Sequence, residues 1–306
     1  FQDVLKSGKN TAILLGNFAQ QHPQAAAIHA AAQALAQATG AKLGFLGEAA
    51  NSVGGYVAGL PAAGGLPQAL KKNALLLLNI DPALDCAHPL GDKASIVNLS
   101  AFKSDVGDVL LPIAPFSETS GTFVSTEGRV QSFHGAVQPL GEARPAWKVL
   151  RVLGTLLDLP GFEFDSSEEV KAECLRGKDL KALLSNGISD PGKPAPVHSQ
   201  GIQRIADVPI YFADPLARRS APLQQTRDAQ PPRAWMNRKL FEQLGLASGS
   251  TVKITQGKGE AMLAAALDDK LPDNCVRVAA GHPLTAGLGP MFGSLAVEKI
   301  TVQRAA

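Results

Sequence analysis

Five short apolar segments dominate the first third of this sequence, and none of them alternates cleanly between apolar and polar residues. Continuous apolar segments of this kind are typical of strands that are covered on both faces of a sheet. Helix-length connections separate them, which favours parallel neighbours. We therefore predict an α/β fold with a mostly parallel open sheet and flanking helices, whose strands are Thr11–Gly16, Ala41–Leu46, Ala74–Leu78, Ser95–Leu99 and Asp108–Leu111.

Two helices can be placed from the residues at their ends. Pro23 suits a helix start and Gly40 suits its end, with an Ala-rich stretch between them. His29 shares a polar face of this helix with two glutamines at a spacing of four residues, so we expect it to point to solvent. A second helix is predicted from about Ala143 to Leu159, before a proline that cannot continue it.

The last part of the sequence has a different pattern of apolar and polar residues. Short segments such as Thr251–Thr255 and Cys275–Ala279 alternate apolar with polar residues, and turns that contain Gly or Pro separate them. This pattern is typical of a small β-barrel or sandwich. The chain therefore divides into an α/β domain at residues 1–160, a charged linker or docking segment at 161–232 and a small β-barrel at 233–306.

The region between the two predicted domains carries two opposite charge runs. Residues 158–173 hold six acids and one base, a balance of −5, and residues 215–239 hold six bases and one acid, a balance of +5. Charge runs are most often solvated faces. The alternative is a surface that docks against a partner, and Arg218, Arg219 and Arg227 are the residues expected to make that contact.

Composition argues against several classes of protein. A net charge of +2 over 306 residues does not favour a nucleic-acid partner, and no apolar run approaches the roughly 18–20 residues that span a membrane. The cysteines Cys86, Cys174 and Cys275 are far apart and form no CxxC pair, so we expect no iron–sulfur or zinc site held by this segment alone. Because the sequence begins at Phe1, we expect a piece of a longer protein.

The stretch Glu118–Gln131 could be an active-site loop or a structural hairpin. Gly128 can supply the positive φ of a turn, and Phe123 and Phe133 can pack together across the two strands. Glu118 stands at the far end of the fifth strand, but no His or Cys lies within a few residues to form an acid–base pair with it. Reactive groups need an orienting partner, so we predict a structural hairpin.

Two other segments resemble ligand-binding motifs without their usual context. Gly187–Pro194 has the glycines and the lysine of a P-loop, but a proline replaces the Ser or Thr that binds magnesium. Asp81–His88 gathers metal-ligand residue types beyond the third strand without a recognised metal spacing. We predict a linker and a polar loop, and we assign no residue of this chain to catalysis, cofactor binding or metal binding.

The order of several motifs resembles the molybdopterin oxidoreductase family. DVLLP at Asp108–Pro112 precedes E-x-x-GT at Glu118–Thr122, EGRVQ at Glu127–Gln131 and GEARPAW at Gly141–Trp147, the order that marks the later α/β domain of that family. The segment from Asn237 through LFEQLGLASGSTVKI resembles the family's C-terminal pterin-dinucleotide-binding barrel.

A more specific resemblance lies in DPLARRSAPLQQTRDA at Asp214–Ala229. It is similar to the large iron–sulfur subunit of NADH–quinone oxidoreductase, respiratory complex I. This resemblance implies a cofactor-free scaffold with no catalytic centre of its own, inside an oxidoreductase whose iron–sulfur clusters lie in N-terminal modules outside this sequence. It also implies other hydrophilic-arm subunits as partners, on the cytoplasmic side of a bacterial inner membrane or the matrix side of a mitochondrial one.

Two alternatives remain open at this point. The chain could belong to a catalytic molybdopterin oxidoreductase of the formate dehydrogenase type, with a pterin guanine dinucleotide held by the glycine-rich stretch around Gly54–Gly65 and by the barrel. The barrel turn has Ser250 after its glycine, where cofactor-bearing relatives often have an acid, which weakens this alternative. The chain could also be an unrelated α/β module that binds a small ligand near Asp81 and Glu118.

Overall fold

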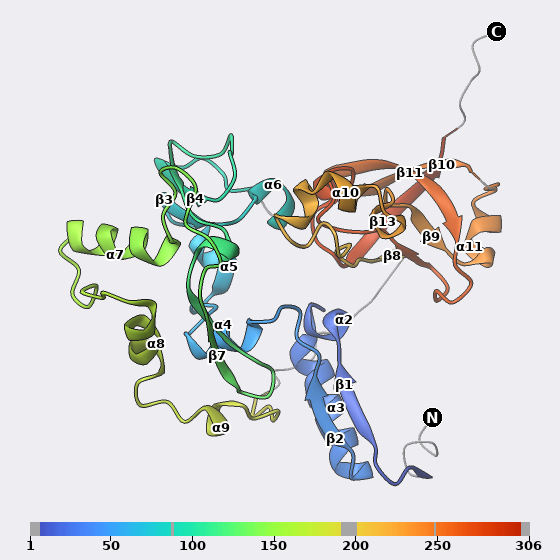
Figure 1. Cartoon of the computed structure of the whole chain (residues 1–306). Helices are drawn as coiled ribbons and strands as arrows, with labels where there is room; N and C mark the ends of the chain where they lie inside the picture. Colours follow the sequence, from blue (N-terminus) through green and yellow to red (C-terminus); the bar gives the residue numbers. More distant parts are fainter. Residues whose placement is uncertain (1–6, 87–88, 191–200, 248, 301–306) are drawn as a thin grey trace. The chain divides into compact units, whose positions relative to one another are not determined.

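The computed structural model describes residues 7–86, 89–190, 201–247 and 249–300 (Figure 1). The chain divides into two compact units. Unit 1 consists of Phe1–Gln20, Ala25–Ile80 and Leu90–Gly192, and unit 2 consists of Gln21–Gln24, Asp81–Pro89 and Lys193–Ala306. Two short segments from the first third of the sequence therefore belong to the C-terminal unit.

All five predicted apolar segments form strands in unit 1, and the α/β fold with parallel sheets is confirmed. The strands are shared between two sheets: β1 (Ala12–Leu15) pairs with β2 (Lys42–Phe45), and β4 (Ser95–Ser100) lies between β3 (Ala74–Leu78) and β5 (Val109–Pro112). Every one of these pairings is parallel. An apolar pattern identifies a strand but not its neighbour, so the division into two sheets was not predicted.

The first predicted helix is α3 (Ala25–Thr39), which packs on β1 and β2 and ends at Gly40, whose φ is +71°. His29, predicted to point to solvent, is half-buried: its Nε2 lies 2.7 Å from the carbonyl oxygen of Asn186 and its ring packs edge-on against Phe45. The second predicted helix is α7 (Ala146–Leu156). The remaining helical elements of unit 1 are α2 (Asn17–Gln20), α4 (Ser52–Val57), α5 (Gly65–Ala69), η1 (Phe116–Glu118), α8 (Ser167–Leu175) and α9 (Leu180–Leu183).

The stretch Glu118–Gln131 forms a hairpin in unit 1. Strand β6 (Gly121–Val124) pairs antiparallel with β7 (Val130–Phe133). Gly128 in the turn has a φ of +79°, which is unfavourable for other residue types. The rings of Phe123 and Phe133 meet edge-on with their centroids 5.2 Å apart, so the hairpin has the local packing that its sequence predicts.

Unit 2 contains a closed six-stranded barrel with the strand order β10-β11-β9-β12-β8-β13, and β13 pairs back onto β10. The structure confirms the small β-barrel. Its strand β8 comes from the stretch predicted as a linker, because four residues with two polar side chains give little apolar signal. The strands are β8 (Ile202–Ile205), β9 (Ala234–Met236), β10 (Thr251–Gln256), β11 (Gly259–Leu267), β12 (Cys275–Arg277) and β13 (Gly293–Lys299).

The interior of the barrel is filled by its own side chains. β10 alternates along its whole length, with Val252, Ile254 and Gln256 buried. Val276 and Val278 from the region of β12 are also fully buried in this core. None of the described helices in either unit is both long and apolar enough to cross a membrane. The helical elements of unit 2 are α6 (Pro82–Asp85), η2 (Ala217–Arg219), α10 (Ala221–Gln224), η3 (Arg227–Ala229), α11 (Arg238–Gln243) and η4 (Ala286–Leu288).

Candidate functional site

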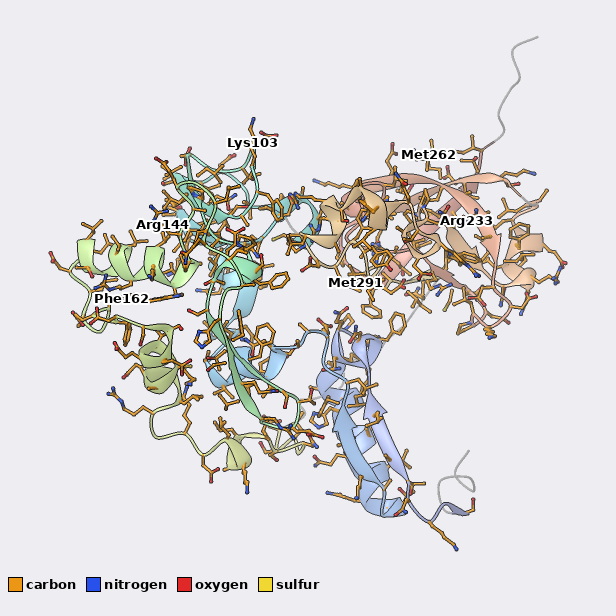
Figure 2. All side chains as sticks on the ribbon, viewed as in Figure 1. Lys103, Arg144, Phe162, Arg233, Met262 and Met291 are labelled. Atoms are coloured by element: carbon orange, nitrogen blue, oxygen red, sulfur yellow. The ribbon has the colours of Figure 1, made fainter. Side chains whose placement is uncertain are left out.

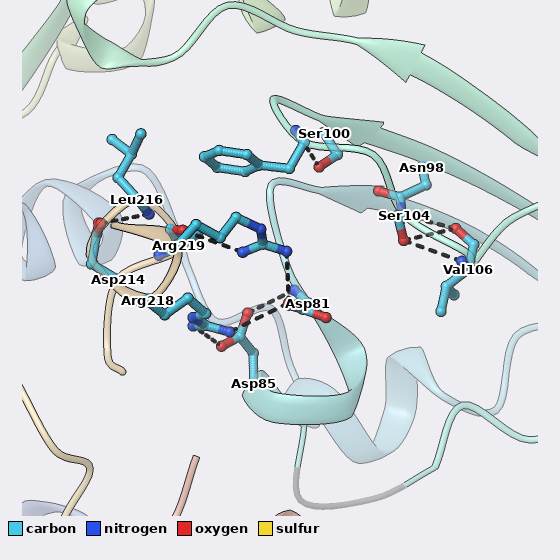
Figure 3. A network of polar contacts seen from close by, with 12 residues as sticks. Asp81, Asp85, Asn98, Ser100, Ser104, Val106, Asp214, Leu216, Arg218 and Arg219 are labelled. Atoms are coloured by element: carbon cyan, nitrogen blue, oxygen red, sulfur yellow. Dashed lines mark hydrogen bonds and ion pairs between the residues drawn. The ribbon is translucent and has the colours of Figure 1, made fainter. Parts of the chain in front are cut away.

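Two acids and two arginines form an ion-pair cluster in unit 2 (Figure 3). Nη2 of Arg218 donates to Oδ1 of Asp85 at 2.6 Å, and Nη2 of Arg219 donates to Oδ2 of Asp81 at 3.0 Å. Nη1 of Arg218 lies 3.6 Å from the same oxygen of Asp81. The two sequence segments that we considered for ligand binding and for docking therefore contact each other.

Local hydrogen bonds place these four side chains. Oδ2 of Asp85 accepts the backbone N–H of Asp81 at 2.6 Å across the short helix α6. Oδ1 of Asp214 accepts the backbone N–H groups of Leu216 and Ala217 at 2.8 and 2.9 Å, which fixes the turn that leads into η2. Because Arg218 and Arg219 belong to η2, this turn aims both guanidinium groups at α6 (Figure 3).

Arg218, one of the residues predicted to dock against a partner, is buried in unit 2. Only 4% of its side chain is exposed, whereas Arg219 is 36% exposed. A buried charge is costly when it lacks a partner, and the charge of Arg218 is already paired with Asp81 and Asp85, so Arg218 offers no free positive charge. Asp81, which we considered as a ligand-binding residue, is also used in this pair. Arg227, on η3, is exposed.

Half of the remaining bases in this run are also paired with acids within unit 2. Arg238 pairs with Asp269 at 3.3 Å, and Lys239 pairs with Asp273 at 2.5 Å. The hydrogen bond from Lys239 lowers the pKa of the Asp273 carboxyl. Four of the six bases in residues 215–239 are therefore paired with acids. The other two, Arg227 and Arg233, are exposed and form no ion pair within the described part of the chain (Figure 2 labels Arg233).

The barrel contains a buried arginine that we did not predict as a special residue. Arg204 on β8 is only 1% exposed. Its Nη1 donates to the side chain of Gln256 at 3.0 Å and to the carbonyl of Pro290 at 3.0 Å, and its Nη2 donates to the carbonyl of Ala279 at 3.0 Å. Burial lowers the pKa of Arg204 to about 10, because the charged form is less stable away from water. The only sequence feature that could have predicted a buried arginine here is a single charged residue within a four-residue strand, and such a feature is a weak indication.

The glycine-rich stretch Gly54–Gly65 does not form an extended phosphate cradle. It begins within α4 and reaches the start of α5. The space beside Gly54 is taken by the side chain of Asn51, whose Oδ1 accepts the backbone N–H of Val124 at 2.9 Å. The missing side chain at Gly54 thus makes room for a contact between α4 and the β6–β7 hairpin, and Gly54, Asn51 and Val124 also line a cavity of about 230 Å³.

Glu118, the other candidate ligand residue, has a structural contact. Its Oε2 accepts the backbone N–H of Leu140 at 3.0 Å, which ties the end of η1 to the loop after the hairpin. Glu118 and His134 both line a cavity of about 580 Å³ in unit 1. This cavity brings an imidazole near the acid, which the spacing in the sequence did not predict.

The cysteines are single thiols in the structure. All three are free. Burial raises the pKa of Cys86, with a further contribution from Asp85, and burial also raises the pKa of Cys275. In residues 7–86, 89–190, 201–247 and 249–300, no three His, Cys, Asp or Glu side chains gather as a metal site. His88, Ser248 and residues 191–194 of the P-loop-like segment lie outside the described residues.

Comparison with known proteins gives relatives of two kinds. The sequence model of the molybdopterin oxidoreductase family matches residues 1–156. A provisionally named formate dehydrogenase of Staphylococcus aureus is 39% identical over 117 residues, which cover 37% of this chain and 11% of that protein. The mitochondrial NADH-ubiquinone oxidoreductase 78 kDa subunit of Candida albicans is 31% identical over 126 residues, which cover 37% of this chain and 17% of that protein.

The matched segments thus span less than a fifth of the length of these two curated relatives. Among solved structures, acetylene hydratase from Pelobacter acetylenicus aligns with a TM-score of 0.46 and 14% identity, over 68% of this chain and 40% of that chain. A likeness at this level does not bear on function.

Proposed function

Because this chain belongs to the molybdopterin oxidoreductase family, we propose that it is a structural, cofactor-free part of a subunit of NADH–quinone oxidoreductase. That enzyme transfers electrons from NADH through iron–sulfur clusters to quinone. In this proposal the clusters lie in a part of the protein outside this sequence. The chain packs against other subunits of the hydrophilic arm, on the cytoplasmic side of a bacterial inner membrane or on the matrix side of a mitochondrial one.

The observation that carries the proposal is that three arginines of unit 2 are bound by acids or oxygens of unit 2 itself. A pterin dinucleotide carries phosphate groups, and arginine is the residue best suited to bind phosphate in two-pronged hydrogen bonds. In unit 2, Arg218 and Arg219 are instead bound by Asp81 and Asp85. Arg204 is bound by oxygens of its own barrel. These arginines stabilise the fold of the chain, as expected for a scaffold.

Two further observations support complex I as the setting. The matched subunit of Candida albicans belongs to NADH-ubiquinone oxidoreductase. The ion-paired arginines lie in the DPLARRSAPLQQTRDA segment, whose sequence resembles the large subunit of that enzyme. Within this segment, Arg218 and Arg219 form ion pairs with Asp85 and Asp81.

Elemental analysis of the purified complex that contains this chain tests the proposal. We expect several iron atoms per complex and no stoichiometric molybdenum or tungsten. Calorimetric titration of the 306-residue chain with GDP gives a second test, since a cofactor-free scaffold should show no saturable binding. Stoichiometric molybdenum, or GDP binding at micromolar concentration, would contradict the proposal.

A catalytic molybdopterin oxidoreductase of the formate dehydrogenase type is the second candidate. The observation in its favour is the 39% identity to the provisionally named formate dehydrogenase of Staphylococcus aureus. On this alternative, the purified protein contains about one molybdenum or tungsten atom per chain and reduces an artificial electron acceptor when formate is added. The two candidates therefore differ in metal content as well as in activity.

A further inference from the structure

An apolar groove of about 540 Å³ lies along helix α7 in unit 1. Most of its lining comes from α7 itself, and Leu111 of β5 and Phe164 of the following loop complete it. The apolar lining residues are Leu111, Val149, Val152, Leu153, Leu156 and Phe164. Its volume is within the range of about 300–1,000 Å³ that small-molecule sites have.

The rim of this groove is basic. Arg144, Lys148 and Arg151 line it together with one acid, Asp165, so three bases minus one acid give +2. Oδ1 of Asp165 lies 3.7 Å from Nη2 of Arg151, which assigns the acid to that arginine. Figure 2 labels Arg144, just before the start of α7.

Arg144 and Lys148 form no ion pair in the described part of the chain. Nη1 of Arg144 donates only to the carbonyls of its neighbours Gly141 and Ala143, at 3.2 and 2.8 Å. Nζ of Lys148 lies 5.4 Å from the centroid of the Trp147 ring, a cation–π contact that leaves its charge uncompensated. Both side chains can therefore bind an anionic group without first breaking an ion pair.

Two buried N–H donors belong to residues that line the same groove. Nε1 of Trp147 and Nε of Arg151 are shielded from solvent and have no hydrogen-bond partner among the described residues. Buried donors are nearly always paired in folded proteins, because leaving one unpaired is costly. An acceptor group bound in the groove would offer these two donors a partner.

We propose that the groove binds an amphipathic carboxylate, a small molecule with an apolar body and one anionic head. The body packs against the apolar side chains of α7 and against Phe164. The planar head suits the fork of a guanidinium, because a carboxylate accepts two parallel hydrogen bonds from arginine. Arg144 and Lys148 bind the head, and Trp147 offers its indole N–H as a further donor.

A neighbouring polar cavity indicates where the head lies. The cavity of about 580 Å³ that includes Glu118 shares Arg144, Trp147, Lys148 and Asp165 with the groove. Of the two acids that line only the polar cavity, Glu168 pairs with Lys171, whereas Glu118 accepts, among the described residues, only the N–H of Leu140, keeps its negative charge and repels an anionic head. The head therefore lies at the shared end, and the apolar body extends along α7 away from these acids.

Tryptophan fluorescence can test the proposal in the 306-residue chain. The chain has two tryptophans, so Trp235→Phe leaves Trp147 as the only emitter. We expect octanoate to change the Trp147 emission saturably. Acetate lacks the apolar body and 1-octanol lacks the charge, so each should bind at least tenfold more weakly.

Charge variants identify the residues that hold the head. Arg144→Gln combined with Lys148→Gln should weaken octanoate binding at least tenfold. Lys103→Gln is the matched control, because Lys103 is an exposed lysine of unit 1 that lines neither the groove nor the polar cavity. Lys148→Gln alone keeps the test usable if the double variant does not fold, since Lys148 is exposed and makes only the cation–π contact; it should still weaken binding several-fold.

Three results would overturn the proposal. Binding of 1-octanol as tight as that of octanoate would show that charge plays no part. Unchanged octanoate affinity in the charge variants would exclude Arg144 and Lys148 as the head site. Saturable binding of an acidic peptide without any octanoate binding would show that the groove docks a protein segment instead.

Discussion

Nη1 of Arg204 donates a hydrogen bond to Oε1 of Gln256 at 3.0 Å inside the closed barrel of unit 2. Gln256 in turn donates from its Nε2 to the carbonyls of Pro290 and Phe292, at 3.0 and 3.2 Å. The pair thus connects β8 and β10 to the chain between β12 and β13. A charged side chain is tolerated in this barrel because nearby oxygens accept hydrogen bonds from all three of its guanidinium nitrogens, including Nε, which donates to Val278.

Replacing Arg204 should destabilise the barrel more than an ordinary polar substitution. Arg204→Met fills part of the space but leaves several carbonyls without a donor, and we expect a loss of about 3 kcal/mol in the free energy of unfolding of unit 2. Urea unfolding followed by Trp235 fluorescence measures this loss, with Trp147→Phe as the background. Arg233→Met is the control, because Arg233 is exposed, and a similar loss there would contradict the explanation.

The stability of unit 2 should fall when the pH drops below about 6.5, the ordinary pKa of histidine. Burial lowers the pKa of His282 below 6.5, and its Nδ1 accepts the backbone N–H of Leu284 at 3.1 Å, which requires an unprotonated Nδ1. The unfolded chain then binds a proton at a higher pH than the folded chain, so acidification through this window favours unfolding. The loss continues until the pH reaches the lowered pKa of the folded state.

Urea midpoints of unit 2 between pH 7 and pH 5 test this dependence. His282→Gln cannot be protonated, so the slope of stability against pH should flatten in this range. Asp273 acts in a different pH range, because the pKa of its carboxyl is lowered from 3.8 in the folded chain. Its contribution to stability is present above pH 3.8 and is lost as the pH falls from 3.8 through the lowered pKa. An equal slope in the variant and in the parent protein would mean that another group is responsible.

Local sequence patterns predicted the individual strands and turns of this fold better than they predicted which strands pair with each other. The five apolar segments, the Gly128 hairpin and the alternating strand β10 were predicted from apolar continuity, glycine and period-two burial. The division of the strands between two sheets depends on which edges form hydrogen bonds, and a sequence pattern does not encode that choice. β8 was missed because its central Arg204 looks like a surface residue in a window of four.

The charge pattern did not predict the ion pairs of the basic run for a similar reason. Arg218 and Asp85 are 133 residues apart, so a local charge count sees an unbalanced basic run where the fold has an ion pair. Exposure is likewise a property of the folded chain, so the sequence did not show that Arg218 is buried while Arg227 is exposed. The groove along α7 was not predicted. An amphipathic helix with a few bases has the same sequence pattern whether or not a cavity forms beside it.

Charge reversal at Arg218 should now damage unit 2 itself. Arg218→Glu places a buried acid beside Asp81 and Asp85, and we expect a loss of about 3–5 kcal/mol in the free energy of unfolding. The exchange Arg218→Glu with Asp85→Arg restores one opposite-charge pair and should recover part of this loss. Urea unfolding followed by Trp235 fluorescence measures both variants. If Arg218→Glu unfolds at the same urea concentration as the parent protein, the cluster is not structural.

Arg227 is the remaining test of the docking prediction. It is exposed and forms no ion pair within the described residues, so Arg227→Glu should leave the urea midpoint of the chain unchanged, within about 0.5 kcal/mol. If this face docks against a neighbouring subunit, the variant should be recovered in the assembled complex several-fold less than the parent. Lys103→Glu makes the same charge change in unit 1 and serves as the control. Equal recovery of both variants would remove Arg227 from the interface.

The Asn51–Gly54 contact predicts a coupled pair of substitutions in unit 1. A Cβ added at Gly54 would lie 2.0 Å from Oδ1 of Asn51, so Gly54→Ala must displace the side chain that accepts the N–H of Val124. We expect Gly54→Ala to cost about 1–3 kcal/mol, in line with other overpacking substitutions. In an Asn51→Ala background the clash is absent, and alanine should then be neutral or stabilising in α4 because it forms helices better than glycine. Urea unfolding followed by Trp147 fluorescence, in a Trp235→Phe background, measures this cycle, and additive effects of the two substitutions would show that the contact does not limit residue 54.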